Sequence, residues 1–123
     1  MDFPAVRLDQ HGIVHIDYGT QARLDVETVD AAFRRHLALT GPVRRPVLVR
    51  CHRLTHSDRA TEERCHDADI RAVTAAVALL TESYMQGLLA KMYLHYRPPP
   101  YPCRAFTSES EAIAWLRQYR PTR

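Results

Sequence analysis

The sequence predicts an α/β protein: a single domain with one mixed sheet and flanking helices, in the element order β-β-α-β-α-β-α-β-α. Two short segments near the start alternate apolar and polar residues, which is typical of a β-hairpin. After them, stretches with helical spacing alternate with short apolar runs, the pattern of a sheet covered by helices. The length of 123 residues, with 46% hydrophobic and 25% charged residues, fits one domain with its own core.

The hairpin and a first helix occupy the first third of the chain. Residues 6–8 and 14–18 form the alternating segments, and Gly12 between them can adopt the positive φ of a turn. Asp25 is the expected N-cap of the helix, and Gly41-Pro42 ends it. Its expected buried stripe comprises Val26, Val29, Ala32, Phe33, Leu37 and Leu39.

A buried strand and a polar helix are predicted next. The strand covers 46–51, with Pro46 as its first residue, where no ladder donor is lost. After the loop, Ser57 is the expected N-cap of a helix from Asp58 to about Ala68.

The segment 73–80 fits either a buried strand or part of a long helix, and periodicity alone does not separate these. The capping box formed by Ser83 and Gln86 favours a strand followed by a new helix. The apolar face of that helix comprises Met85, Leu88, Leu89, Met92, Tyr93 and Tyr96.

The proline-rich segment 97–103 must run extended, and a short strand, RAFTS, follows it. A second capping box, Ser108 with Glu111, opens the last helix. Its apolar face comprises Ala112, Ile113, Trp115, Leu116 and Tyr119.

Charge and composition bear on location and partners. Sixteen arginines and one lysine give a net charge of +3, but acids are interleaved along most of the chain, so we expect no nucleic-acid partner. The longest apolar run, 75–80, is too short to span a membrane. The first residues do not resemble a signal peptide, and three cysteines are an odd number, so we expect a cytoplasmic protein.

The stretches GIVHIDY, PVLVRCHRLTHSDRAT and PPPYPCRAFTSESEAIAWL together resemble small bacterial STAS-like proteins, a group that includes anti-anti-sigma-factor-like domains. The stretch PPPYPCRAFTSESEAIAWL is similar to a proline-, arginine- and tryptophan-containing pattern of an uncharacterised family of this kind. GIVHIDY and PVLVRCHRLTHSDRAT also resemble their counterparts there. The resemblance spans nearly the whole chain and implies a STAS-like fold, with no catalytic signature.

Phosphoregulated STAS proteins carry Asp-Ser in the loop after the central strand, and a partner kinase phosphorylates that serine. Here Asp58 matches the aspartate, but Arg59 stands in place of the serine. Ser57, one position before the aspartate, is a possible displaced phosphoacceptor, although its role as an N-cap alone accounts for it.

Cysteines and histidines are concentrated in residues 51–66 and raise the question of a metal or thiol site. Their ligand spacing, C-H-x3-H-x8-C-H, matches no structural zinc motif. No recognised cysteine-nucleophile signature accompanies Cys51 or Cys65, and Cys65 is expected in mid-helix. We therefore predict no metal, no cofactor and no catalytic residue, with a thiol or metal enzyme as the least favoured alternative.

The favoured hypothesis is a non-catalytic regulatory or protein-interaction domain that forms a homodimer. Its candidate partner loop comprises His52, Arg53, Thr55, His56, Ser57, Asp58 and Arg59. The alternative is a module that binds a small molecule or lipid in an apolar pocket near 93–103. The candidate pocket residues are Tyr84, Met92, Tyr93, Tyr96 and Tyr101, although such a stripe more often belongs to the core.

Overall fold

A five-stranded sheet forms the centre of the computed structural model, which describes residues 3–19, 23–51 and 56–121. Its strands, in spatial order, are β1 (Ala5–Leu8), β2 (Val14–Asp17), β4 (Arg45–Cys51), β6 (Thr74–Thr81) and β7 (Cys103–Phe106). β1 and β2 form the antiparallel hairpin, and every other neighbouring pair is parallel. The predicted mixed sheet is confirmed, and the ambiguous segment 73–80 lies in the strand β6 except for Val73, which is the C-cap of the helix before it.

A second, two-stranded sheet was not predicted. It pairs β3 (Arg23–Leu24) with β5 (His56–Ser57) in parallel. Two residues are too few to show the alternation by which a strand is recognised in a sequence.

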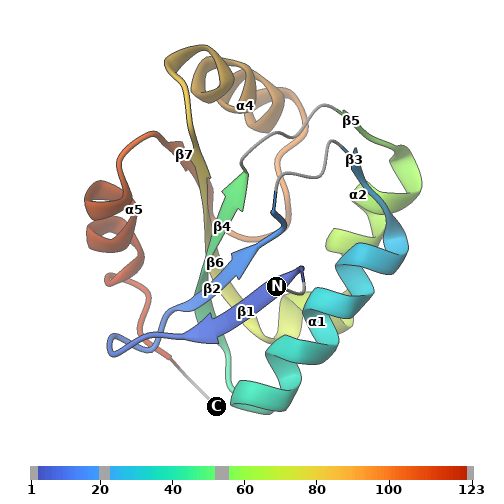
Figure 1. The fold of residues 1–123 in the computed structure, drawn as a ribbon, viewed down its shortest axis with the longest axis vertical. Helices are drawn as coiled ribbons and strands as arrows, with labels where there is room; N and C mark the ends of the chain where they lie inside the picture. Colours follow the sequence, from blue (N-terminus) through green and yellow to red (C-terminus); the bar gives the residue numbers. More distant parts are fainter. Residues whose placement is uncertain (1–2, 20–22, 52–55, 122–123) are drawn as a thin grey trace.

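In the part of the chain that the structure describes, five helices surround the sheet: α1 (Val26–Thr40), α2 (Arg59–Cys65), α3 (Ala68–Ala72), α4 (Tyr84–Tyr96) and α5 (Glu109–Leu116). Figure 1 shows α5 on one face of the sheet, α1 and α2 on the other, and α4 at one end of the molecule. Within the described residues, no helix has the length and apolar character needed to cross a membrane.

Helix caps explain most of the observed boundaries. Asp25, Ser83 and Ser108 each accept a hydrogen bond from the backbone N–H three residues on, as predicted. Gly41 ends α1 with a φ of 63°.

The predicted cap of α2 was wrong. Asp58 itself is the N-cap, accepting from the N–H of Thr61 at 2.9 Å, and the helix begins at Arg59. Serine and aspartate are equally good N-caps, so the sequence alone does not decide whether Ser57 or the adjacent Asp58 caps the helix. The helix also ends earlier than expected, which places Cys65 at its last residue, and α3 follows as a separate turn of helix.

Pro46 lies inside the central strand β4, which begins one residue earlier than predicted. The register with β6 shifts between Arg45 and Pro46, so that Arg45 pairs with Thr74 and Pro46 with Ala76. Such an irregularity accommodates the missing donor of a proline between two neighbouring strands.

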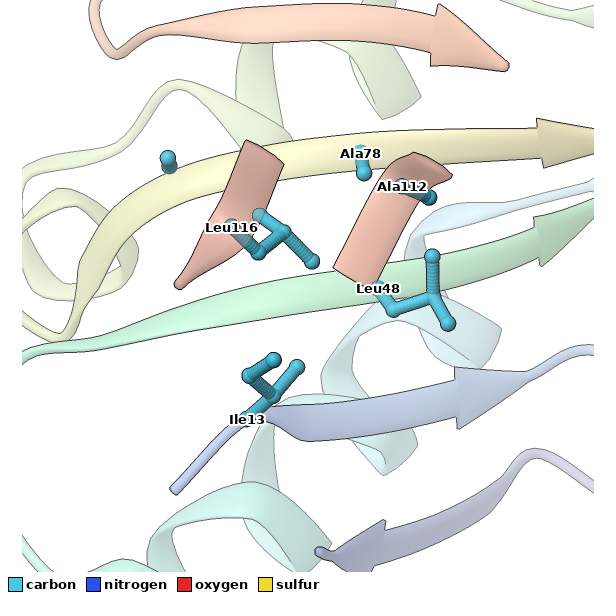
Figure 2. Close-up of a cluster of buried hydrophobic side chains, with 6 residues drawn as sticks. Ile13, Leu48, Ala78, Ala112 and Leu116 are labelled. Atoms are coloured by element: carbon cyan, nitrogen blue, oxygen red, sulfur yellow. The ribbon is translucent and has the colours of Figure 1, made fainter. Parts of the chain in front are cut away.

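Strand alternation divides the core into two layers. On the α5 side, Leu48 and Ala78 pack with Ile13, Ala112 and Leu116, each fully buried (Figure 2). On the α1 side, Val47 and Val77 pack with Val14, Ile16 and Ala32. The predicted inner face of the last helix is confirmed for Ala112 and Leu116, which are buried, and for Ile113 and Trp115, which pack against them. Tyr119 packs against the same cluster, but it lies in the turn after α5, because the helix ends at Leu116 and not beyond Tyr119 as predicted.

Two helices differ from expectation in the face that they bury. In α1 the buried residues are Val29, Ala32 and His36, whereas Leu37 and Leu39 are 37% and 49% exposed. In α4 the predicted apolar face points to solvent, and the only buried residue of the helix is Gly87. If Gly87 carried a Cβ atom, that atom would lie 3.3 Å from Thr107 Cγ2. The side of α4 that carries Gly87 is therefore the side that packs closely against the rest of the domain.

The proline-rich segment before β7 is neither helix nor strand, as predicted. The carbonyl of Pro102 accepts a hydrogen bond from the N–H of Val77 at 2.8 Å, which joins the end of this segment to β6.

Candidate functional site

A cavity of about 210 Å³ lies between the sheet and the helices α1, α2 and α3. Its floor is formed by strand residues that alternation points to this side of the sheet, among them Val47, Val49, Val77 and Leu79. Val29, Ala32 and Phe33 of α1 supply a second apolar wall, and Pro99 from the proline-rich segment lies at another side. The site is therefore concave and mainly apolar, the character of small-molecule sites in proteins.

Arg64 holds the helical walls in place. Its guanidinium donates to Asp30 of α1 at 2.6 Å and to Asp69 of α3 at 2.8 Å, and it lies 5.5 Å above the ring of Phe33. The hydrogen bonds to the two carboxylates raise the pKa of Arg64, and the bond from Arg64 lowers the pKa of Asp69. Three helices that line the cavity are thus joined through one side chain.

An ion pair lies at the side of the cavity formed by α2 and the end of α4. Arg97 Nη1 donates to Glu62 Oε2 at 2.9 Å. Burial raises the pKa of Glu62, but hydrogen bonds from Tyr93 and Arg97 outweigh it and leave the pKa lowered. Burial and the bond to Glu62 raise the pKa of Tyr93 to about 12, so its hydroxyl keeps its proton.

The end of α2 contributes a thiol and an imidazole. Tyr101 Oη donates to the carbonyl of Cys65 at 3.2 Å, and the ring of His66 meets the Tyr101 ring edge-on, with centroids 6.4 Å apart. Burial raises the pKa of Cys65 to about 11, so this thiol is protonated at neutral pH. A protonated thiol is a poor nucleophile, which argues against Cys65 as an activated cysteine.

His36 is a buried polar residue of the cavity wall. Its side chain comes from the inner stripe of α1, is 3% exposed, and has Nε2 without a hydrogen-bond partner. Burial, with the nearby charge of Arg45, lowers its pKa, so the ring is neutral. A buried polar atom without a partner is costly. Nε2 itself has almost no exposed surface, so a polar group of a bound molecule would meet it only after a small shift of the cavity wall.

The predicted partner loop is only partly described. His52, Arg53 and Thr55 lie outside the described residues, as do the side chains of His56 and Ser57, whose backbone forms β5. Asp58 caps α2, which gives it a structural role. Arg59 is exposed and pairs with Glu63 along the same helix at 3.1 Å.

The predicted pocket residues separate into two groups. Tyr93 and Tyr101 line the cavity. Tyr84, Met92 and Tyr96 are 76%, 58% and 77% exposed and do not contribute to its wall. The segment 93–103 thus borders a cavity, but from the end of α4 and not from its apolar face.

Sequence reasoning missed His36, Glu62 and Arg97 as cavity residues. His36 lies seven residues after Val29 and four residues after Ala32, so the helical spacing alone predicts that it shares their buried stripe. Glu62 and Arg97 are 35 residues apart in sequence, and no local sequence pattern predicts that they form an ion pair. Among the residues with described side chains, no three His, Cys, Asp or Glu groups gather as metal ligands. Cys51, His52 and His56 lie outside that set.

The strand order and flanking helices define a SpoIIAA-like, or STAS-like, α/β domain. The crystal structure of an uncharacterised DUF3478-family protein with this fold, from Shewanella loihica PV-4, matches with a TM-score of 0.61. The match covers 91% of this chain and 90% of that chain at 14% identity, so the similarity concerns the fold alone.

The chain belongs to a family described as a domain of unknown function (DUF7793), whose model matches residues 7–120. A protein of unknown function from Arthrobacter sp. FB24 is 27% identical over 94% of both chains, with a TM-score of 0.34. No curated protein shows a significant match.

Proposed function

We propose that this domain is a non-catalytic binding module that holds a small, mainly apolar molecule in the cavity beside the sheet. The cavity itself carries the proposal, because a volume of about 210 Å³ is not filled by the side chains around it. A cavity of roughly 150 Å³ lined by apolar groups is known to accept benzene, so this one has room for a slightly larger molecule. The ligand would be one that is mostly hydrocarbon, on the scale of a substituted aromatic ring.

His36 defines the polar part of the ligand. Its neutral ring offers Nε2 either as donor or as acceptor, depending on the tautomer. One hydroxyl, ring N–H or carbonyl on the ligand would satisfy this atom. A full charge would find no free counter-ion, because the charged residues Glu62 and Arg97 at the side of the cavity already pair with each other. We therefore expect an uncharged ligand with one hydrogen-bonding group.

Titration of the isotope-labelled protein with indole, followed by amide chemical shifts, tests the proposal. Saturable shifts confined to lining residues such as Val49 and Val77 are expected. Ala32→Leu should weaken them because its larger side chain occupies the cavity, whereas Ala114→Leu, the same change at an exposed position of α5, should not. Shifts that never saturate, or that are equal in both variants, would contradict a cavity site.

The role of His36 has a separate readout. Indene has the shape of indole but no N–H, so the wild type should bind indole more tightly, by roughly fivefold for a net hydrogen bond of about 1 kcal/mol. His36→Leu should remove that preference. A preference that persists in the variant would exclude His36 as the polar contact.

A regulatory, partner-binding role at the loop 52–59 remains a prediction. One observation supports it: the α2 helix that follows this loop also forms a wall of the cavity through Glu62 and Cys65. A ligand that shifts α2 would alter the surface presented beside the loop. Capture of a partner that depends on Arg59, compared in the presence and absence of indole, tests this role.

A further inference from the structure

The helix α4 presents its apolar side to solvent. Seven of its eight large apolar side chains are between 38% and 77% exposed: Tyr84, Met85, Leu88, Leu89, Met92, Tyr93 and Tyr96. At about 100° per residue they fall within roughly half of the helix circumference. We call this surface the α4 face.

The opposite side of the helix is already used. Gly87 is buried against Thr81 and Thr107, and α4 contacts the strands β6 and β7. Leu94, on the same side, reaches the cavity wall. The α4 face therefore cannot turn inward without detaching the helix, and Figure 1 shows α4 as an outer element at one end of the molecule.

The size of the α4 face exceeds that of an ordinary exposed patch. If each large side chain presents about 200 Å² when fully exposed, the seven together expose on the order of 800 Å². The largest apolar patch of a typical monomer is roughly 300–600 Å², whereas one partner of a stable interface contributes about 800 Å². Tyrosine and methionine are also residues that interface cores favour.

We propose that the α4 face binds the α4 face of a second copy of this chain, forming a twofold dimer of antiparallel helices. In a twofold dimer, a residue near the symmetry axis faces the same residue of the other copy. A charged residue at the centre of the contact would therefore face a like charge, so the centre must be uncharged. The centre of the α4 face meets this condition, because Met85 and Met92 lie there. Of the ionisable groups of the helix other than tyrosine, Lys91 lies outside the face and His95 lies toward its edge, on the side of Tyr84 and Leu88.

Antiparallel packing suits the helix ends as well. The amino-terminal end of one α4 then lies near the carboxyl-terminal end of the other, which is the favourable arrangement of their dipoles. A membrane surface is a poorer occupant, since helices that lie on membranes carry several basic residues beside the apolar face, and α4 has a single lysine.

Sedimentation velocity of the full chain over a wide dilution series tests the proposal. We expect a concentration-dependent dimer whose dissociation constant rises at least about a hundredfold in Leu89→Glu and in Met92→Glu, because each would bury an unpaired charge. Both positions are 58% exposed in the single chain, so the variants should keep the wild-type circular dichroism. Leu39→Glu, on an exposed part of α1, is the matched control and should dimerise normally.

A wild type that is monomeric throughout the series would overturn the proposal, as would a dimer that persists in both glutamate variants. A monomer that binds phosphatidylglycerol vesicles, and loses binding in Met92→Glu, would overturn it in favour of a membrane surface. The two variants avoid Tyr93, which also borders the cavity, so dimerisation and indole binding are tested separately.

Discussion

Replacing Leu116 by alanine is expected to remove a large share of the stability of this domain. Leu116 is fully buried on α5 and packs in a cluster with Ile13, Leu48 and Ala78 (Figure 2). Three members of this buried cluster are alanines, and a methyl group cannot swing into a vacated space. We therefore expect little collapse, and a loss of about 3–4 kcal/mol in the free energy of unfolding.

Urea denaturation measures this loss as a lower midpoint with an unchanged slope. The melting temperature should fall by roughly 10–15 °C for a domain of this size. Leu39→Ala is the control, because Leu39 is 49% exposed and should cost no more than about 1 kcal/mol. Equal losses at the two positions, or a loss below about 1.5 kcal/mol at Leu116, would refute the assignment of the α5 face as core.

Three further predictions concern pH, the cavity walls and a helix cap. Burial is the main cause that lowers the pKa of both His15 and His36 below 6.5, so below that pH the unfolded chain binds more protons than the folded chain. The free energy of unfolding should therefore be highest above about pH 6.5 and decline below it. Urea midpoints that do not fall from about pH 8 to 5.5 would contradict this prediction. Arg64→Ala should cost about 1–2 kcal/mol, since its partners are partly exposed, and should speed hydrogen exchange in α2 and α3 but not in α5, whereas uniform changes would argue against a local anchor. Asp58→Ala should cost about 1 kcal/mol through loss of the bonds to Thr61, and Glu63→Ala, at an exposed position of the same helix, should change the urea midpoint far less.

Local chemistry made much of the fold predictable. Ser83 and Ser108 marked helix starts because a side-chain acceptor is needed where backbone N–H groups lack partners. The cap at Ser83 also favoured a strand before it, since a helix that begins at this residue cannot include the preceding segment, and the structure shows that 74–81 is a strand. The hairpin followed from alternation and from the positive φ of Gly12.

What the sequence left open depends on contacts between distant segments. Periodicity showed that the apolar residues of α4 share one side, but not that Gly87 would set the opposite side against the strands. His15 likewise gave no sign that it would be buried, accept a bond from Arg7 at 3.1 Å and pair with Asp9 at 2.7 Å. The cavity is a gap between elements, so only their assembly reveals it.

The two ends of the sheet bear on how this protein can meet other chains. The edge strands β1 and β7 have four residues each, and each contains an arginine, Arg7 and Arg104. The prolines before β7 lack backbone donors, so that edge cannot lengthen toward them. Short strands and arginines thereby disfavour backbone pairing between molecules, the route to open-ended fibrils, at both edges, and the prolines oppose it further at β7. A symmetric contact through a helix, such as the one proposed for the α4 face, would instead close after two copies.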